Sequence, residues 1–132
     1  MQSNILDRKG QRMKEFTFPA LHGGEVYCRL WEPSVPPRAV LQIVHGIAEH
    51  AGRYEEFAAY LTQHGVLVAA EDHMGHGKSI AAGQTPGYFQ GGWENAVADA
   101  LQLQKHLLQT YPDVPYFLLG HSMGSFLART ML

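Results

Sequence analysis

The sequence is poor in cysteine and lacks the long apolar runs of membrane proteins. Cys28 is its single cysteine, so no disulfide can form within the chain, and a reducing compartment is expected. No apolar stretch approaches the ~18 residues of a membrane span. The polar N-terminal stretch "MQSNILDRKGQRMKEF" has no apolar core of a signal peptide. We therefore expect a cytoplasmic protein without a stable membrane anchor.

A surplus of positive charge is also missing. The sequence has 10 Lys and Arg and 12 Asp and Glu, which give a formal net charge of −2, and no cluster of basic residues occurs along it. Nucleic acid is therefore not expected as a partner. With 132 residues, 45% of them hydrophobic, the chain has the size and composition of one globular domain. We predict a single domain over residues 1–132, in which the polar residues 1–14 form a flexible N-terminus.

The order of the expected elements indicates an α/β fold. The stretch "EFTFPALHGGEVYCRLWEP" predicts a β-hairpin that turns at Gly23-Gly24. Short runs of branched aliphatic residues then predict three buried strands, "AVLQIVHG", "GVLVAAEDH" and "YFLLGHS". Amphipathic patterns lie between these strands, and "MGSFLARTML" starts a third helix. An opening hairpin followed by alternating strands and helices is typical of parallel β-α-β units.

The two helices between the strands are expected over residues 53–64 and 93–108, each with one buried stripe. The helical spacing assigns these residues to the stripes: Tyr54, Phe57, Ala58 and Leu61 in the first helix, and Trp93, Val97, Ala100, Leu101 and Leu108 in the second.

The stretch "LLGHSMGS" places Ser122 between an expected strand and an expected helix, with Gly120 and Gly124 on either side. A Gly-x-Ser-x-Gly pattern in this position predicts a nucleophile elbow, in which a β-carbon at either glycine would clash. The N–H of Met123 then lies at a helix start, where it can stabilise an oxyanion, and a second N–H is expected from Ile47. The alternative is a tight turn with a capping serine.

Three blocks now resemble one known family. "HGIAEHAGRYEEFAAYL", "EDHMGHGKS" and "FLLGHSMGS" are similar, in this order, to the signatures of α/β-hydrolases of the monoacylglycerol lipase and lysophospholipase type. The resemblance implies a serine nucleophile at Ser122, an oxyanion hole from Ile47 and Met123, and hydrolysis of small acyl-lipid esters without a cofactor. One departure is Ala48, where the family usually has glycine, so the loop geometry is expected to differ slightly there.

Part of the implied catalytic triad is missing. In this architecture the acid and the histidine follow the serine along the chain, and the ten residues "MGSFLARTML" contain neither. We therefore expect the N-terminal half of an α/β-hydrolase domain, apparently cut, with residual activity at most. The parent reaction would be hydrolysis of carboxylic esters through an acyl-enzyme, with peptides and thioesters left open. A non-catalytic binding or structural fragment is the alternative.

The remaining polar residues near these motifs are given supporting roles. His45 and Gly46 end the strand before the oxyanion loop, and Glu49 or His50 is expected to hold this loop through its backbone or through Arg53. His121 should point away from Ser122, because adjacent side chains in an extended segment project to opposite sides.

The loop "DHMGHGKS" raises two other possibilities. Asp72, His73 and His76 lack a fourth ligand at a matching spacing, so a metal site is not expected. Gly77-Lys78-Ser79 copies the end of a phosphate loop, which makes nucleotide binding a distant alternative. Finally, in the resembled fold further strands encoded by the missing portion pair beyond the strand 116–120. This strand is therefore predicted to be an exposed apolar edge in the isolated chain, where it could cause self-association.

Overall fold

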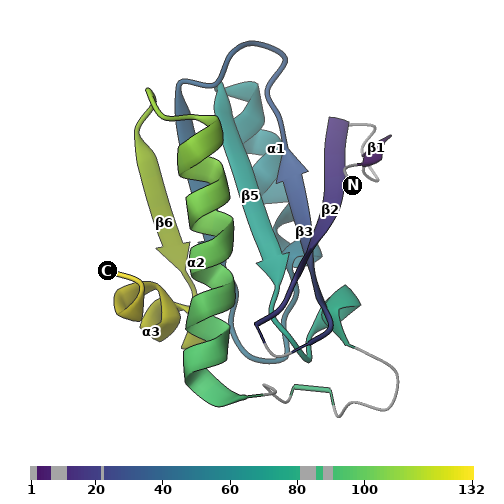
Figure 1. Cartoon of the computed structure of the whole chain (residues 1–132). Helices are drawn as coiled ribbons and strands as arrows, with labels where there is room; N and C mark the ends of the chain where they lie inside the picture. The colour runs from purple at the N-terminus through teal and green to yellow at the C-terminus, as the bar shows by residue number, and fades with distance from the viewer. Residues whose placement is uncertain (1–2, 7–11, 22, 81–85, 88–90) are drawn as a thin grey trace.

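The computed structural model describes residues 3–6, 12–21, 23–80, 86–87 and 91–132. These residues form one 6-stranded mixed sheet in the order β1-β2-β3-β5-β4-β6 (Figure 1). The strands are β1 (Ser3–Leu6), β2 (Arg12–Pro19), β3 (Glu25–Trp31), β4 (Ala39–Val44), β5 (Val66–Asp72) and β6 (Tyr116–Gly120). The α-helices are α1 (Glu55–Gln63), α2 (Gly92–Thr110) and α3 (Met123–Thr130), and the 3-10 helices are η1 (Ala51–Tyr54) and η2 (Gly77–Ser79).

The sheet has an antiparallel side and a parallel side. β1, β2 and β3 are antiparallel neighbours, β3 is antiparallel to β5, and β4 is parallel to both β5 and β6. The predicted hairpin and the predicted parallel β-α-β units are therefore confirmed. Within the predicted flexible N-terminus of residues 1–14, residues 3–6 pair with residues 12–15 as strands, and residues 1–2 and 7–11 lie outside the described part of the chain. The ladder of backbone hydrogen bonds to β2 orders this polar segment, a contact that composition alone does not reveal.

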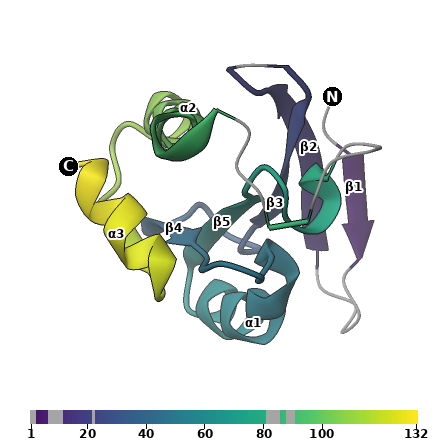
Figure 2. The same ribbon diagram turned by 90° about the horizontal axis from the view of Figure 1, so that it is seen from below.

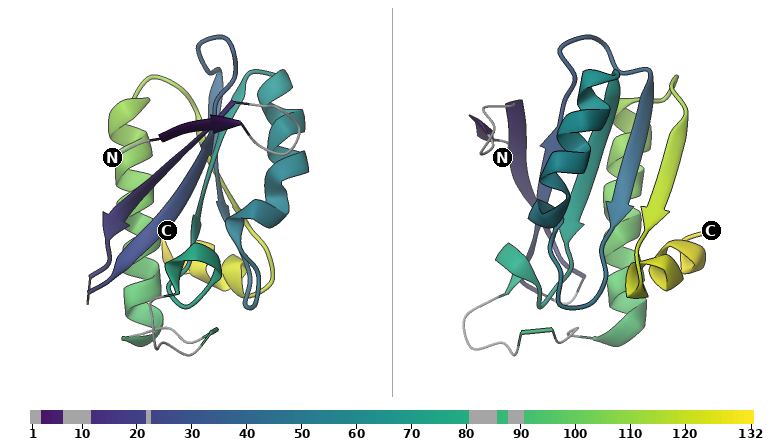
Figure 3. Two further views of the ribbon diagram at one scale, coloured as in Figure 1. Left: turned by 90° about the vertical axis from the view of Figure 1, so that its right-hand side faces the viewer. Right: turned by 180° about the vertical axis from the view of Figure 1, so that it is seen from behind.

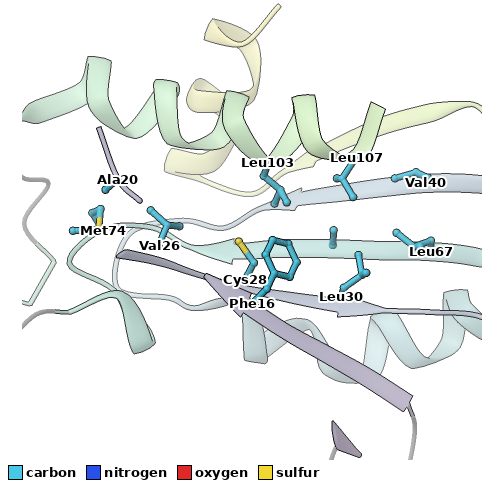
Figure 4. Close-up of a cluster of buried hydrophobic side chains, with 11 residues drawn as sticks. Phe16, Ala20, Val26, Cys28, Leu30, Val40, Leu67, Met74, Leu103 and Leu107 are labelled. Atoms are coloured by element: carbon cyan, nitrogen blue, oxygen red, sulfur yellow. The ribbon is translucent and has the colours of Figure 1, made fainter. Parts of the chain in front are cut away.

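Helices cover both faces of the sheet. α1 lies on one face, and α2 and α3 lie on the other (Figures 2 and 3). Between α2 and the sheet, buried side chains from several strands pack against Leu103 and Leu107 (Figure 4). On the opposite face, Trp31, Ile43 and Val68 form a second cluster with Ala58 of α1. None of the described helices is both long and apolar enough to cross a membrane.

The predicted buried stripes of the two long helices are partly wrong. Phe57 of α1 is 42% exposed, whereas Ala58 and Ala59 are buried. In α2, the side chains of Trp93, Leu101 and Leu108 are exposed, and the buried apolar residues are Ala96, Val97, Ala100, Leu103 and Leu107. The small alanines let the helix axis approach the sheet closely, so the contact face is turned toward them. One sign of this approach is the hydrogen bond of 3.1 Å from Gln42 of β4 to the carbonyl oxygen of Ala100.

Candidate active site

Ser122 occupies a strained turn between β6 and α3. Its backbone has φ 56° and ψ −122°, a region that non-glycine residues rarely adopt, and the residue is exposed. It stands at the N-cap of α3, yet its side chain makes no capping hydrogen bond in the described part of the chain. The geometry is the predicted strand-to-helix elbow, and the hydroxyl is not used to hold the helix.

The two glycines beside Ser122 are required by close packing. A β-carbon on Gly124 would overlap the carbonyl oxygen of Val44 and lie 2.5 Å from that of His45. A β-carbon on Gly120 would lie 2.5 Å from the carbonyl oxygen of Gly124. The first turn of α3 therefore packs directly on the end of β4, and both predicted clashes are present.

The loop after β4 meets the elbow in space. A β-carbon built on Gly46 would lie 3.2 Å from Cβ of Ser122 and 3.1 Å from the carbonyl oxygen of His121, so the two segments are in contact. Ile47 follows at once and is 56% exposed. Met123 is the first residue of α3, and neither its N–H nor that of Ile47 donates a hydrogen bond to another described residue. The loop that carries Ile47, one predicted oxyanion donor, therefore begins beside Ser122. Met123, the other predicted donor, directly follows Ser122 in the sequence.

Glu49 ties this loop to the elbow. Its Oε1 accepts hydrogen bonds from the N–H of Gly46 (2.6 Å) and from the Tyr54 hydroxyl (3.2 Å), and lies 3.0 Å from Nδ1 of His121. Its Oε2 pairs with the guanidinium of Arg53. Burial raises the pKa of Glu49, but the hydrogen bonds from His121 and Gly46 and the charge of Arg53 outweigh it and lower the pKa to about 2. An ionised carboxylate only accepts, so Nδ1 of His121 carries a proton.

These contacts show which of Glu49 and His50 holds the oxyanion loop. Glu49 holds the loop as predicted, through backbone and through Arg53. The side chain of His50 is exposed, and its carbonyl oxygen accepts the N–H of Arg53 at 3.2 Å. His121 contacts Glu49 and is 55% exposed, and its orientation away from Ser122 stays a prediction.

His45 fixes the base of the same loop from inside the protein. Its Nε2 accepts the backbone N–H of His73 at 3.0 Å, so Nδ1 carries the proton and donates to the carbonyl oxygen of Gly46 at 2.6 Å. Nε2 of His73 lies 3.0 Å from the carbonyl oxygen of His45 in return. Burial and the neighbouring His73 lower the pKa of His45 to about 3, so the ring is neutral and both of its nitrogens are occupied.

The glycine-rich loop after β5 is held by Asp72, a contribution that the sequence analysis did not identify. Oδ1 of Asp72 accepts the N–H of Ala51 at 2.6 Å, and Oδ2 accepts the N–H of Lys78 at 2.9 Å. The Ser79 hydroxyl donates to the carbonyl oxygen of Asp72 at 2.6 Å, and Lys78 pairs with Glu15 at 3.2 Å. These contacts give no support to a phosphate loop. Across the described residues, no group of three or more potential ligands is arranged to hold a metal ion.

Comparison with known proteins agrees with this geometry. A family model described as "Serine aminopeptidase, S33" matches residues 35–132. The monoglyceride lipase of Mus musculus is 45% identical over 102 residues, which are 77% of this chain and 32% of the mouse protein. The monoacylglycerol lipase of Mycolicibacterium smegmatis is 37% identical over 110 residues, which are 83% of this chain and 38% of that protein.

Solved structures give the same answer for the fold. The crystal structure of a thermostable carboxyl esterase from Bacillus coagulans in complex with glycerol superposes with a TM-score of 0.82 at 36% identity, over 90% of this chain and 39% of the esterase. The chain spans about a third of the length of the curated relatives it matches. The extent of the family match, together with these identities, shows that the chain belongs to the serine aminopeptidase S33 family of α/β-hydrolases, with monoacylglycerol lipases among its relatives.

Proposed function

We propose that this chain carries the nucleophile side of a carboxylic-ester hydrolase site. Ser122 is the nucleophile, and the N–H groups of Ile47 and Met123 bind the oxyanion. The observation that carries the proposal is the backbone of Ser122, at φ 56° and ψ −122°, with the Gly46 loop packed against it. An exposed serine in so strained a conformation, with no capping role, is typical of a nucleophile elbow.

The arrangement suits acyl transfer. The Ser122 oxygen attacks the ester carbonyl carbon, the carbonyl oxygen becomes an anion, and collapse of this intermediate expels the alcohol and leaves an acyl-enzyme that water then hydrolyses. The Met123 N–H lies at the N-terminus of α3, where the helix dipole favours negative charge. Removing one such donor from a hydrolase typically costs about 10²–10³ in rate.

A base must also take the Ser122 proton. In α/β-hydrolases the acid and the histidine follow the serine in sequence, and residues 123–132 supply neither. His45 cannot serve, because Nδ1 donates to Gly46 and Nε2 accepts from His73. His121 contacts Glu49 through Nδ1, and its position next to Ser122 in an extended segment predicts that its ring points away from the serine. We therefore expect this chain to retain at most the residual rate of hydrolases stripped of triad members, roughly 10³–10⁴ over water.

The proposed substrates are small acyl esters of the monoacylglycerol or lysophospholipid type. The relatives include proteins described as monoglyceride lipases, and a carboxyl esterase has a similar structure. Enzymes that cleave peptides and thioesters use the same elbow chemistry. Turnover rates should therefore be compared across a panel of esters that differ in acyl length.

Two proteins test the proposal. The first is the 132-residue chain, and the second joins it to the part of mouse monoglyceride lipase that lies C-terminal to the matched region. We expect weak turnover of a short-chain nitrophenyl ester by the first and strong turnover by the second. Ser122→Ala should abolish activity in both, whereas Ser34→Ala, at an exposed loop serine, should not.

Three results would count against the proposal. Strong turnover by the 132-residue chain that disappears in Ser122→Ala would mean that a base lies within these residues. An inactive but folded chimera, or one that is unaffected by Ser122→Ala, would favour the alternative of a non-catalytic fragment.

A further inference from the structure

A buried glutamate lies behind the oxyanion loop and has no role in the function proposed above. Glu71 of β5 is 1% exposed, and no described residue donates a hydrogen bond to either of its carboxylate oxygens. It lies opposite Cys28 of β3, on the face of the sheet that α2 covers. Its Oε1 is 3.3 Å from Nδ1 of His73, and Nε2 of the same ring contacts the carbonyl oxygen of His45. The chain itself already encloses this carboxyl group.

The direction of the Ile47 N–H depends on the two peptide groups around Gly46. The carbonyl of Gly46 and the N–H of Ile47 belong to one planar peptide group and point in opposite directions. Nδ1 of His45 donates to that carbonyl oxygen at 2.6 Å and so orients the Ile47 N–H. The preceding peptide group is held at both ends: its carbonyl oxygen lies 3.0 Å from Nε2 of His73, and its N–H donates to Oε1 of Glu49 at 2.6 Å. His73 therefore supports the loop through the carbonyl of His45 and, by its own N–H, through the ring of His45.

The contact with the His45 carbonyl fixes the tautomer of His73. A carbonyl oxygen only accepts, so Nε2 of His73 carries a proton. Burial outweighs the hydrogen bond to His45 and the charge of Asp72 and lowers the pKa of His73 to about 4. The ring is therefore neutral at pH 7, and its Nδ1 has a lone pair that faces Oε1 of Glu71. An ionised Glu71 would set two acceptors against each other, so one proton is needed between these atoms.

We propose that Glu71 is a positioning residue of the oxyanion loop: as a neutral acid it donates its proton to Nδ1 of His73, which keeps the Nε2 proton on the His45 carbonyl. This role rests on the proposed function, in which the Ile47 N–H binds the oxyanion. The distance of 3.3 Å is at the long end for a hydrogen bond. The alternative is an ion pair in which His73 holds both protons, and desolvation disfavours two separated charges at this depth.

The groups around Glu71 favour its neutral form. On β3, burial raises the pKa of the Cys28 thiol, and the buried Asp99 of α2 acts on the same thiol. β4, with the sequence AVLQIV, contributes no titratable side chain. In the loop after β5, burial lowers the pKa of His76, so this ring adds no positive charge at neutral pH. Burial and the negative charge of Asp72 together raise the pKa of Glu71 to about 8.

Ionisation of Glu71 should release the loop contact. Above about pH 8 the acid proton passes to solvent, and the carboxylate then accepts the single ring proton of His73, which moves from Nε2 to Nδ1. The carbonyl oxygen of His45 thereby loses its donor, and the loop before Ile47 loses one of its restraints.

NMR spectroscopy of the full chain with ¹⁵N-labelled histidine tests the proposal, because the shifts of the two ring nitrogens distinguish the neutral tautomers. At pH 6 we expect His73 to carry its proton at Nε2 and to accept a hydrogen bond at Nδ1. As the pH rises through about 8, the proton should move to Nδ1, and the amide resonance of Ile47 should shift with the same midpoint. A His73 ring that is protonated at Nδ1 at pH 6, or that keeps one tautomer from pH 6 to pH 9, would overturn the proposal.

A conservative substitution separates the donated proton from the shape of the side chain. Glu71→Gln keeps an N–H donor toward Nδ1 but cannot ionise, so His73 should show the wild-type tautomer at pH 6 and keep it up to pH 9. Glu25→Gln, at an exposed residue of β3, should titrate like the wild type. A tautomer change that persists in Glu71→Gln would overturn the role of Glu71. These spectra do not depend on turnover: if they are as expected but Ser122→Ala leaves ester hydrolysis unaffected, the hydrogen bonds from Glu71 to the loop stand and the proposed function fails.

Discussion

Replacing Glu71 with glutamine should stabilise the protein in a way that depends on pH. Glu71 is 1% exposed, and neither of its carboxylate oxygens has a hydrogen-bond partner among the described residues. It lies opposite Cys28 in the β3–β5 register, on the face covered by α2. Oε1 is 3.3 Å from Nδ1 of His73. Burial and, to a smaller extent, the neighbouring Asp72 raise the pKa of Glu71 to about 8, so the folded protein holds this group as a neutral acid.

The size of the effect follows from proton linkage. The pKa is 4.5 in the unfolded chain and about 8 in the folded one. The contribution of Glu71 to stability is therefore complete below pH 4.5 and is lost as the pH rises toward 8. At 1.36 kcal/mol per pH unit, the loss between pH 4.5 and pH 7 is about 3 kcal/mol. Glutamine does not titrate, so Glu71→Gln should gain about 3 kcal/mol over the wild type between these two pH values.

Urea unfolding followed by circular dichroism at pH 4.5, 6 and 7 measures this difference. Glu25→Gln is the matched control, because Glu25 is exposed at the start of β3, and its effect should be small at every pH. If the free energies of unfolding of Glu71→Gln and the wild type differ by the same amount at all three pH values, the reasoning is refuted. Glu71 would then be ionised in the folded protein.

Three further substitutions test the loop and the elbow. Ala48 has φ 58°, so Ala48→Gly should relieve about 1 kcal/mol of strain and raise the melting temperature; an unchanged or lower temperature would contradict this. Gly124→Ala should cost about 3 kcal/mol in urea unfolding, because its β-carbon would meet the carbonyl oxygens of Val44 and His45; a neutral effect would show that α3 can shift. Glu49, with its pKa lowered from 4.5 to about 2, stabilises the fold above pH 4.5 and loses this contribution as the pH falls through 2. Glu49→Gln should therefore be less stable than the wild type at pH 7, and the two unfolding curves should converge near pH 2; a constant gap would exclude this role.

Local sequence signals predicted the strands and the elbow well. β4, β5 and β6 are short apolar runs that end at a polar or glycine-containing turn. Each run and its turn can be recognised from the residues of that segment alone. The requirement for Gly120 also follows from a short stretch, because its clashes are with Gly124 and Ser125 of the same elbow, whereas Gly124 packs against Val44 and His45 of the distant β4 strand end. The strands and the need for Gly120 could therefore be predicted without knowledge of distant contacts.

Predictions that depended on distant contacts were less successful. In the stripe predicted for α2, Val97 and Ala100 are buried, but Trp93, Leu101 and Leu108 are exposed. The other buried apolar residues of the helix are Ala96, Leu103 and Leu107. The periodicity of a helix gives the spacing between the residues on its buried face. Which of two adjacent faces is buried depends on the element that packs against the helix. The strand at residues 3–6 was missed for a related reason, since its pairing with β2 leaves no apolar signature in a polar segment.

The sequence predicted that Glu49 or His50 holds the oxyanion loop, but the choice of Glu49 and the role of Asp72 required the structure, because their carboxylate oxygens bind groups from different segments. Glu49 also raises a question of charge. A carboxylate close to an oxyanion site opposes the negative charge that develops there. In this protein the guanidinium of Arg53 pairs with Oε2, while Gly46, Tyr54 and the Nδ1 proton of His121 surround Oε1. The charge that positions the loop is thereby balanced by its own donors, and the N–H groups of Ile47 and Met123 donate to no other described residue, as the proposed oxyanion hole requires.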